Sequence, residues 1–252
     1  MKIIVLLYTI ETMDSYPAFM NHPLWDAIRI TRNSNLIGQL RKMNFNRLVS
    51  YITVAVSAFY PISYASLLAF RRFSTLSDDP EAKAIANEIY LVECGERPII
   101  RGSEYTGIKH CEQLKIMFES LFSNINFDIP SPENFEVLRK ADIENADLVK
   151  SLAICDLIET TAPFVIHFYQ DFLIQCQLAL GRSSEFVKRN YLDEHNLTEG
   201  DTCELQHIEM LGRMKLNYSD VISSTAYNTH QRIFVNLVSQ HFSGCLKEME
   251  KS

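Results

Sequence analysis

The sequence predicts an all-α fold, and three observations support that prediction. Only eight glycines and eight prolines occur in 252 residues, fewer turn-forming residues than a compact all-β domain needs. Apolar residues recur at helical spacing, and convincing period-2 strands are missing. The hydrophobic content of 47% is enough for a substantial core, and no repeat, low-complexity tract or linker divides the chain. We therefore expect one domain over residues 1–252, a bundle of about seven to nine helices, with residues 1–20 of uncertain structure.

The N-terminal half predicts a long central helix between two shorter ones. A first amphipathic pattern begins at His22-Pro-Leu-Trp25. From Ile37 to about Phe73 the chain is apolar nearly all round, which is typical of a buried helix. Pro61 predicts a kink or a split in that helix, because proline lacks the backbone N–H. The segment 77–81 combines cap candidates, a proline and an acid, so it predicts the start of a helix that continues to Glu93.

The rest of the chain predicts further helices separated by short loops. A loop covers residues 96–103, and the helical pattern resumes before His110 and runs through Leu121. Proline at 163 predicts a kink or restart within an apolar stretch that ends near Leu180. The remaining helices are expected at about 132–141, at about 144–161, from Ser183 or Ser184 through His195, from near 199 to about 217, and at about 219–247.

Charge and cysteine usage narrow the classes of function. The net charge of −7 and the lack of basic runs or RNA-binding aromatic motifs argue against a nucleic-acid partner. Six scattered cysteines without a C-x-x-C pair predict buried, reduced thiols and a cytoplasmic location. The apolar run 3–10 is short and lacks a cleavage pattern, so we expect no signal peptide, and no membrane partner is expected. The oligomeric state stays open, a homodimer included.

Histidine and acid concentrate in the segment from Tyr191 to His207. His195 and Glu199 are four residues apart, and Glu204 and His207 are three apart, so each pair shares one helix face. Imidazole with carboxylate is the ligand set of catalytic iron, manganese or zinc. On one ideal helix the two histidines would diverge by about 120°, so a break or bulge near Gly200 is needed for both to reach one centre. A solvated polar loop is the alternative interpretation.

Upstream helices offer matching donors. Glu159 lies among apolar residues, where a carboxylate must be neutralised, paired or metal-bound unless the helix turns it to solvent. Glu93 and His110 flank an interrupted helical segment, and such inward-facing donors build metal sites inside helical bundles. The acids that compete with Glu93 on spacing are Glu88, Glu104 and Glu112.

In order and rough spacing, these pieces resemble the haem-oxygenase-like di-metal oxidases, iron-containing redox enzymes with a TenA-like, pyrroloquinoline-quinone-synthase-like fold. The resemblance covers most of the chain, and its motifs are His22-Pro-Leu-Trp25, Asn87 to Glu93-Cys-Gly95 with His110, Glu159-Thr-Thr-Ala-Pro163, and Tyr191-x-x-x-His195 through His207. It implies a bound non-haem iron centre, two ions in the family, and O₂-dependent oxidation of a small organic substrate. The implied ligands are Glu93, His110, Glu159, His195, His207 and one acid among Glu199, Asp201 and Glu204.

The chain departs from the family pattern in its last segment. The family usually reads His-x-x-x-Asp/Glu-x-x-His, whereas Thr202 follows Glu199 at the position of the second histidine. The link between Glu93 and His110 is also longer than usual, so a one-metal centre stays open. Two other functions remain: a TenA-like thiaminase or cofactorless relative with Cys155 or another thiol as nucleophile, and a non-catalytic helical interaction or effector protein.

Overall fold

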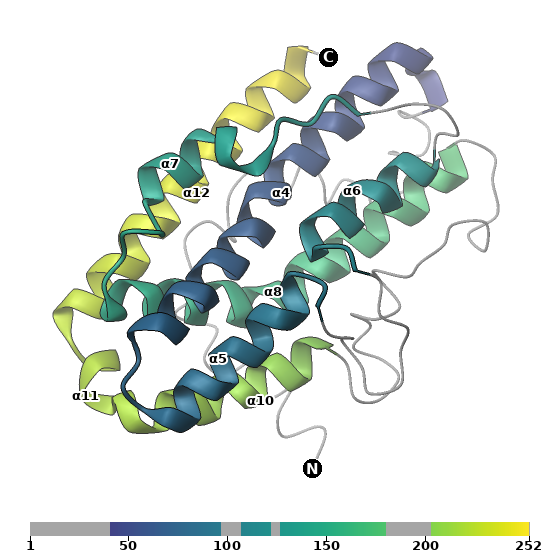
Figure 1. Ribbon diagram of the computed structural model, residues 1–252. Helices are drawn as coiled ribbons and strands as arrows, with labels where there is room; N and C mark the ends of the chain where they lie inside the picture. The colour runs from purple at the N-terminus through teal and green to yellow at the C-terminus, as the bar shows by residue number, and fades with distance from the viewer. Residues whose placement is uncertain (1–40, 97–106, 122–126, 180–202, 252) are drawn as a thin grey trace.

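The computed structural model describes residues 41–96, 107–121, 127–179 and 203–251 (Figure 1). These ranges are mainly helical and contain no strand, so the all-α prediction is confirmed for the part of the chain they cover. The elements are α4 (Phe45–Leu76), α5 (Pro80–Glu93), α6 (His110–Leu121), α7 (Glu136–Ala141), α8 (Leu148–Ala179), α10 (Cys203–Lys215), α11 (Ser219–Ile222) and α12 (Thr225–Lys251), with 3₁₀ turns at Pro132–Asn134 and Leu216–Tyr218.

Helix α4 runs through the middle of the fold, as its apolar sequence predicts. It packs against α5, α6, α8 and α12 (Figure 1). Ile52, Phe70 and Phe73 on this helix are among the largest fully buried side chains. Within the described ranges, α4 is the one helix long and apolar enough to cross a membrane, a test that buried core helices also pass. Most of its apolar window is covered by the rest of the protein, so we interpret α4 as a core helix.

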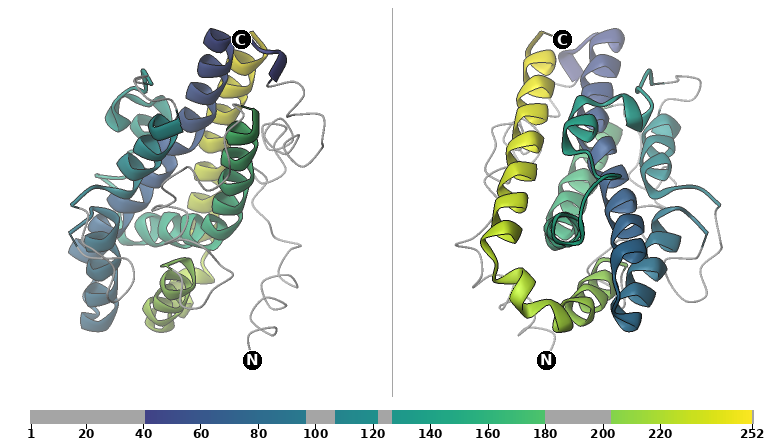
Figure 2. Two further views of the ribbon diagram at one scale, coloured as in Figure 1. Left: turned by 90° about the vertical axis from the view of Figure 1, so that its right-hand side faces the viewer. Right: turned by 60° about the vertical axis from the view of Figure 1, so that its left-hand side comes forward.

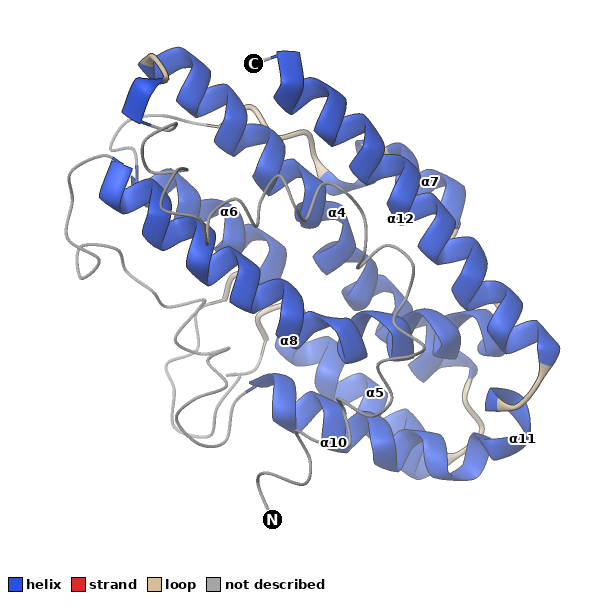
Figure 3. Cartoon of the chain, turned by 180° about the vertical axis from the view of Figure 1, so that it is seen from behind, coloured by secondary structure: helices blue, strands red, loops and turns tan. Residues whose placement is uncertain are grey.

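The predicted split at Pro61 is wrong, because α4 continues through that residue. Proline has no N–H to bond the carbonyl of Ser57 four residues earlier. His241 on α12 donates from Nε2 to this carbonyl at 3.1 Å. Helix α12 lies alongside α4 (Figure 3), and the colouring of Figure 1 shows that the two helices run in opposite directions. A side chain from the last helix thus satisfies the carbonyl that the proline leaves without its helical partner.

Helix starts follow the cap chemistry of the sequence with small shifts. Asp79 caps α5 by accepting from Ala82 N at 2.7 Å, as the proline and acid after it predict. The long helix expected from Ile37 is interrupted at residues 43–44, and α4 begins at Phe45, where Asn44 accepts from Arg47 N and forms its cap; residues 37–40 lie outside the described residues. Helix α8 begins at Leu148 rather than near 144, where Asp147 Oδ1 accepts from Lys150 N at 2.8 Å and caps the helix.

A bend within α8 and a break before α12 set the directions of the later helices. Helix α8 contains Pro163 and continues to Ala179, and Figure 2 shows its two halves running in clearly different directions. Proline is the commonest cause of such a bend. The helix expected at 219–247 is divided, because α11 ends at Ile222 and α12 begins at Thr225. The turn between them brings α12 back along α4 (Figure 2).

Candidate metal centre

Four of the acid and histidine candidates meet inside the protein. Glu93 is the last residue of α5, His110 is the first of α6, Glu159 lies in α8, and His207 lies in α10. Their exposed fractions are 7%, 2%, 4% and 4%, respectively. The question whether Glu159 points inward or to solvent is therefore settled in favour of the interior. Because each side chain comes from a different helix, the cluster forms only when the helices pack.

Hydrogen bonds join the four side chains in two pairs. His110 Nδ1 lies 3.1 Å from Glu93 Oε1, and His207 Nδ1 lies 3.1 Å from Glu159 Oε2. The same oxygen of Glu93 is 3.9 Å from His207 Nδ1, which connects the two pairs. Two carboxylates and two imidazoles thus form one continuous cluster.

Gly95 brings the end of α5 close to the start of α6. Its φ is +76°, a left-handed conformation that favours glycine. A Cβ atom at this position would lie 2.3 Å from the carbonyl oxygen of Ile108. Only glycine allows this approach, which places His110 beside Glu93 although a segment of the chain separates them. The Glu93-Cys-Gly95 motif therefore has a structural reason for its glycine.

Ser66 on α4 is a member of the cluster that the sequence did not reveal. Its hydroxyl is buried and donates to Glu159 Oε1 at 2.8 Å. Both carboxylate oxygens of Glu159 therefore have partners, Ser66 on one and His207 on the other. A serine in an apolar helix carries no signal for such a role, because the residue type and spacing are ordinary.

Burial and mutual charge set the protonation of the cluster. Burial raises the pKa of Glu93 to about 8, and the charge of Glu159 adds to that shift. Burial lowers the pKa of His110 to about 3. For Glu159, burial opposes ionisation, but the hydrogen bond and charge of His207 outweigh it and lower the pKa. For His207, burial opposes protonation, but the hydrogen bond and charge of Glu159 outweigh it and raise the pKa.

At neutral pH these directions give an ion pair between Glu159 and His207 beside a neutral Glu93 and a neutral His110. Two protons, one on Glu93 and one on His207, therefore balance the two carboxylates. A divalent cation bound by both carboxylates would balance the same charge after these protons leave.

The donor geometry also fits a metal ion. Glu93, Glu159 and His207 each offer a ligand atom within 4.8 Å of the other two. Donors about 2.1 Å from a common ion lie roughly 3.0 to 3.4 Å apart in octahedral or tetrahedral geometry. The 3.1 Å and 3.9 Å separations in the cluster already approach this range, so small side-chain movements would suffice.

The other candidates from the sequence do not join this cluster. Glu88 is exposed on α5. Glu112 accepts a hydrogen bond from Tyr60 on α4. Outside the described residues lie Glu104, His195, Glu199 and Asp201, and the side chain of Glu204 is likewise outside the described part of α10. The predicted break near Gly200 also falls outside the described residues.

The described cysteines do not suit nucleophilic catalysis. Cys155, the thiol proposed for a thiaminase-like reaction, is fully buried, and burial raises its pKa well above the ordinary value. Burial also raises the pKa of each of the other described thiols, Cys94, Cys111, Cys176 and Cys245. Reactive cysteines need a lowered pKa, because the thiolate is the nucleophile.

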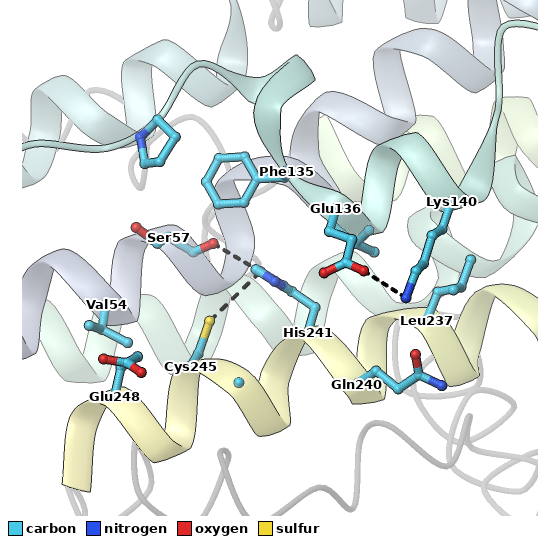
Figure 4. Close-up of a pocket in the computed structure, with 13 residues that line it drawn as sticks. Val54, Ser57, Phe135, Glu136, Lys140, Leu237, Gln240, His241, Cys245 and Glu248 are labelled. Atoms are coloured by element: carbon cyan, nitrogen blue, oxygen red, sulfur yellow. Dashed lines mark hydrogen bonds and ion pairs between the residues drawn. The ribbon is translucent and has the colours of Figure 1, made fainter. Parts of the chain in front are cut away.

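A separate open groove of about 400 Å³ lies between α4, α7 and α12 and is lined in part by His241 (Figure 4). Cys245 Sγ is 3.8 Å from His241 Nε2, which at first sight is a cysteine–histidine pair. However, Nε2 also contacts the carbonyl of Ser57, and a carbonyl can only accept. Nε2 therefore carries a proton and cannot take one from the thiol. We assign His241 a structural role at the Pro61 site.

No family model matches this chain, and neither does any curated protein or solved structure. Function is therefore inferred from the chemistry of the side chains that the fold brings together.

Proposed function

We propose that this protein is a non-haem iron oxidase or oxygenase that uses O₂ on a small organic substrate. The observation that supports this most is the meeting of two glutamates and two histidines from four helices in a buried cluster. Carboxylate and imidazole ligands with open coordination positions are typical of oxygen-activating iron sites. The proposal includes a haem-oxygenase-like or TenA-like arrangement of the bundle.

Each residue has a distinct part in the proposed centre. A bound Fe(II) ion would supply the site at which O₂ is activated, and O₂ would be the source of the oxidising equivalents. Glu93 and Glu159 supply the two negative charges that offset the ion, and His207 supplies a neutral nitrogen donor. His110 is either a further ligand or the group that orients Glu93 through the 3.1 Å hydrogen bond. Ser66 orients Glu159 from the opposite side.

The number of ions follows from which donors are present. The mutual triad of Glu93, Glu159 and His207 accounts for one ion. A second ion would need further donors, for which the sequence offers His195 with Glu199, Asp201 or Glu204. One ion per chain at the triad is therefore the minimum that we propose.

Anaerobic metal loading tests the proposal. Metal-free protein is titrated with Fe(II), the bound iron is counted, and O₂ uptake is followed on mixing with oxygenated buffer. We expect at least one tightly bound iron per chain and O₂ uptake faster than that of free Fe(II). Glu159→Ala and His207→Ala are expected to lose both. Parallel titrations with Mn(II) and Zn(II) test metal preference.

Three outcomes would contradict the proposal. Protein that binds none of Fe(II), Mn(II) and Zn(II) under anaerobic conditions excludes a metal centre at the cluster. Protein that binds Zn(II) or Mn(II) but leaves Fe(II) unbound, or binds Fe(II) without accelerating O₂ uptake, excludes the oxidase or oxygenase function while keeping a metal site.

A further inference from the structure

A second buried carboxylate on α8 joins three helices. Asp156 is 7% exposed, and its Oδ1 accepts from Lys215 Nζ of α10 at 2.7 Å. Its Oδ2 accepts from the hydroxyl of Tyr227 on α12. Both oxygens are therefore engaged by protein donors, one of them a permanent cation. Asp156 is thus a connection between α8, α10 and α12 rather than a candidate metal ligand.

This connection lies beside the proposed metal ligands. Asp156 precedes Glu159 by three residues, so the two carboxylates share a face of α8. Both point to α10, where Glu159 contacts His207 and Asp156 contacts Lys215. His207 and Lys215 are just over two helical turns apart on α10. Two contacts at separate points along α10 restrict its rotation as well as its distance from α8.

We infer that Asp156 is a positioning residue of the metal centre. Asp156 holds Lys215 and Tyr227, and this arrangement lets His207 meet Glu159 and Glu93. This inference rests on the proposed metal site. In this role Asp156 touches neither metal nor substrate. It acts by fixing the rotation of α10, on which the direction of the His207 side chain depends.

A matched control exists on the same helix. Arg213, two residues before Lys215, contacts Glu81 of α5 at 2.7 Å. The Arg213 and Glu81 side chains are 54% and 59% exposed, whereas those of Lys215 and Asp156 are 27% and 10% exposed. Exposed pairs constrain side chains weakly. Loss of the Arg213 contact removes a similar charge and chain length from α10 without affecting Asp156.

The test measures Co(II) affinity and the visible absorption of the Co(II)-saturated protein, using Co(II) as an oxygen-stable probe of the ligand geometry. Asp156→Asn and Lys215→Met are expected to weaken Co(II) binding by about 10- to 100-fold, as loss of an orienting partner does at other metal sites. Both variants should shift the absorption bands, since His207 no longer meets the ion in its original direction. Lys215→Arg should restore affinity and bands, and Arg213→Met should leave both unchanged.

Wild-type affinity and wild-type bands in both Asp156→Asn and Lys215→Met would overturn the inference. If either variant fails to fold, Tyr227→Phe removes only one hydroxyl and decides the question. A weaker affinity with shifted bands in this variant supports the inference, and unchanged values refute it.

A metal-free readout separates this inference from the proposed function. Wild-type protein that binds neither Co(II) nor Fe(II) refutes the metal site alone. The positioning role is then decided by the proton NMR signal of the hydrogen bond between His207 and Glu159 in metal-free protein. Loss of that signal in Lys215→Met, with recovery in Lys215→Arg, supports the role of Asp156. A signal that persists in Lys215→Met refutes it.

Discussion

Two histidine sites in this protein look alike in composition and differ in chemistry. The glutamate–histidine cluster consists of Glu93, His110, Glu159 and His207 and is buried in the interior. The His241 groove lies between α4, α7 and α12 and is open to solvent, with His241 beside Cys245 (Figure 4). Helix α4 contributes to both, through the Ser66 hydroxyl in the first and the Ser57 carbonyl in the second.

The two sites differ in the groups that face the histidines. In the cluster, carboxylates face the imidazoles, so protons can be exchanged for a cation without leaving unbalanced charge. In the groove, the partner of His241 is a carbonyl, which accepts one hydrogen bond and has no charge to exchange. The open groove is therefore the structural site, and the buried cluster is the one suited to ligand chemistry.

The largest expected difference between the two sites is in metal affinity. Glu159→Gln keeps the shape of the side chain but removes one of the two charges that offset the ion. We expect at least a 100-fold loss of Fe(II) affinity, because losing a charged ligand costs more than losing a residue that only orients a ligand. His241→Ala should leave affinity unchanged. Equal losses in both variants, measured by anaerobic titration, would remove the distinction between the sites.

The two sites should also differ in their response to pH above about pH 6.5, whereas the lowered pKa values of His110 and His241 act in the same direction on the acid side. Unfolded Glu93 loses its proton near pH 4.5, whereas burial keeps the folded, metal-free residue protonated up to about pH 8. The folded state thus holds more protons, and its stability falls as pH rises. One proton changes the free energy of unfolding by roughly 1.4 kcal/mol per pH unit, so this free energy falls by about 2 kcal/mol between pH 6.5 and 8. The raised pKa of His207 acts in the same direction.

Glu93→Gln is expected to flatten this pH dependence in urea unfolding of metal-free protein. A slope as steep as that of the wild type would contradict the assigned protonation of Glu93. The pKa of His241 is lowered by burial, so its contribution is complete above about pH 6.5 and is lost as pH falls. His241→Ala should therefore destabilise the protein most above about pH 6.5, and its difference from the wild type should shrink as pH falls.

A double-mutant cycle can isolate the structural role of His241. His241→Ala removes the donor to the Ser57 carbonyl, and Pro61→Ala supplies a backbone N–H that can take its place. We expect a coupling free energy of about 1 kcal/mol, the usual value of one hydrogen bond. The loss of ring contacts with Phe135 and Phe242 occurs in both backgrounds and cancels. Additive free energies of unfolding would mean that His241 does not satisfy this carbonyl.

Ser66→Ala should have the smallest effect. It removes the hydrogen bond to Glu159 Oε1 and leaves the ligand itself in place. We expect a loss of about 1 kcal/mol in stability and a severalfold weaker Fe(II) affinity, smaller than that of Glu159→Gln. Ser57→Ala is the matched control on the same helix, since Ser57 contributes its backbone carbonyl to the groove. Equal effects of the two substitutions on affinity would refute the orienting role of Ser66.

Features that depend on local chemistry were predictable from the sequence. The start of α5 follows from Asp79 and Pro80, and the buried character of α4 follows from its apolar pattern. The unbroken path through Pro61 was not predictable, because the compensating donor is His241, far away in the sequence. Residue types and order indicated Glu93, His110, Glu159 and His207 as candidates, and the structure places them together.

Other parts of the site had no readable signal. Ser66 and Asp156 are ordinary residues whose partners are set by how α4, α8, α10 and α12 pack. The choice between Glu93 and Glu88 depends on the rotation of α5, which buries one and exposes the other. Packing against the other helices sets this rotation, so facing residues cannot be assigned from spacing alone.

Anomalous X-ray diffraction at the iron edge, from crystals of anaerobically Fe(II)-loaded protein, tests the central claim most directly. We predict an anomalous peak about 2.0 to 2.3 Å from donor atoms of Glu93, Glu159 and His207, and its absence in His207→Ala. A peak elsewhere in the protein, or none in the cluster at full iron loading, would contradict the assignment of this cluster as the metal centre.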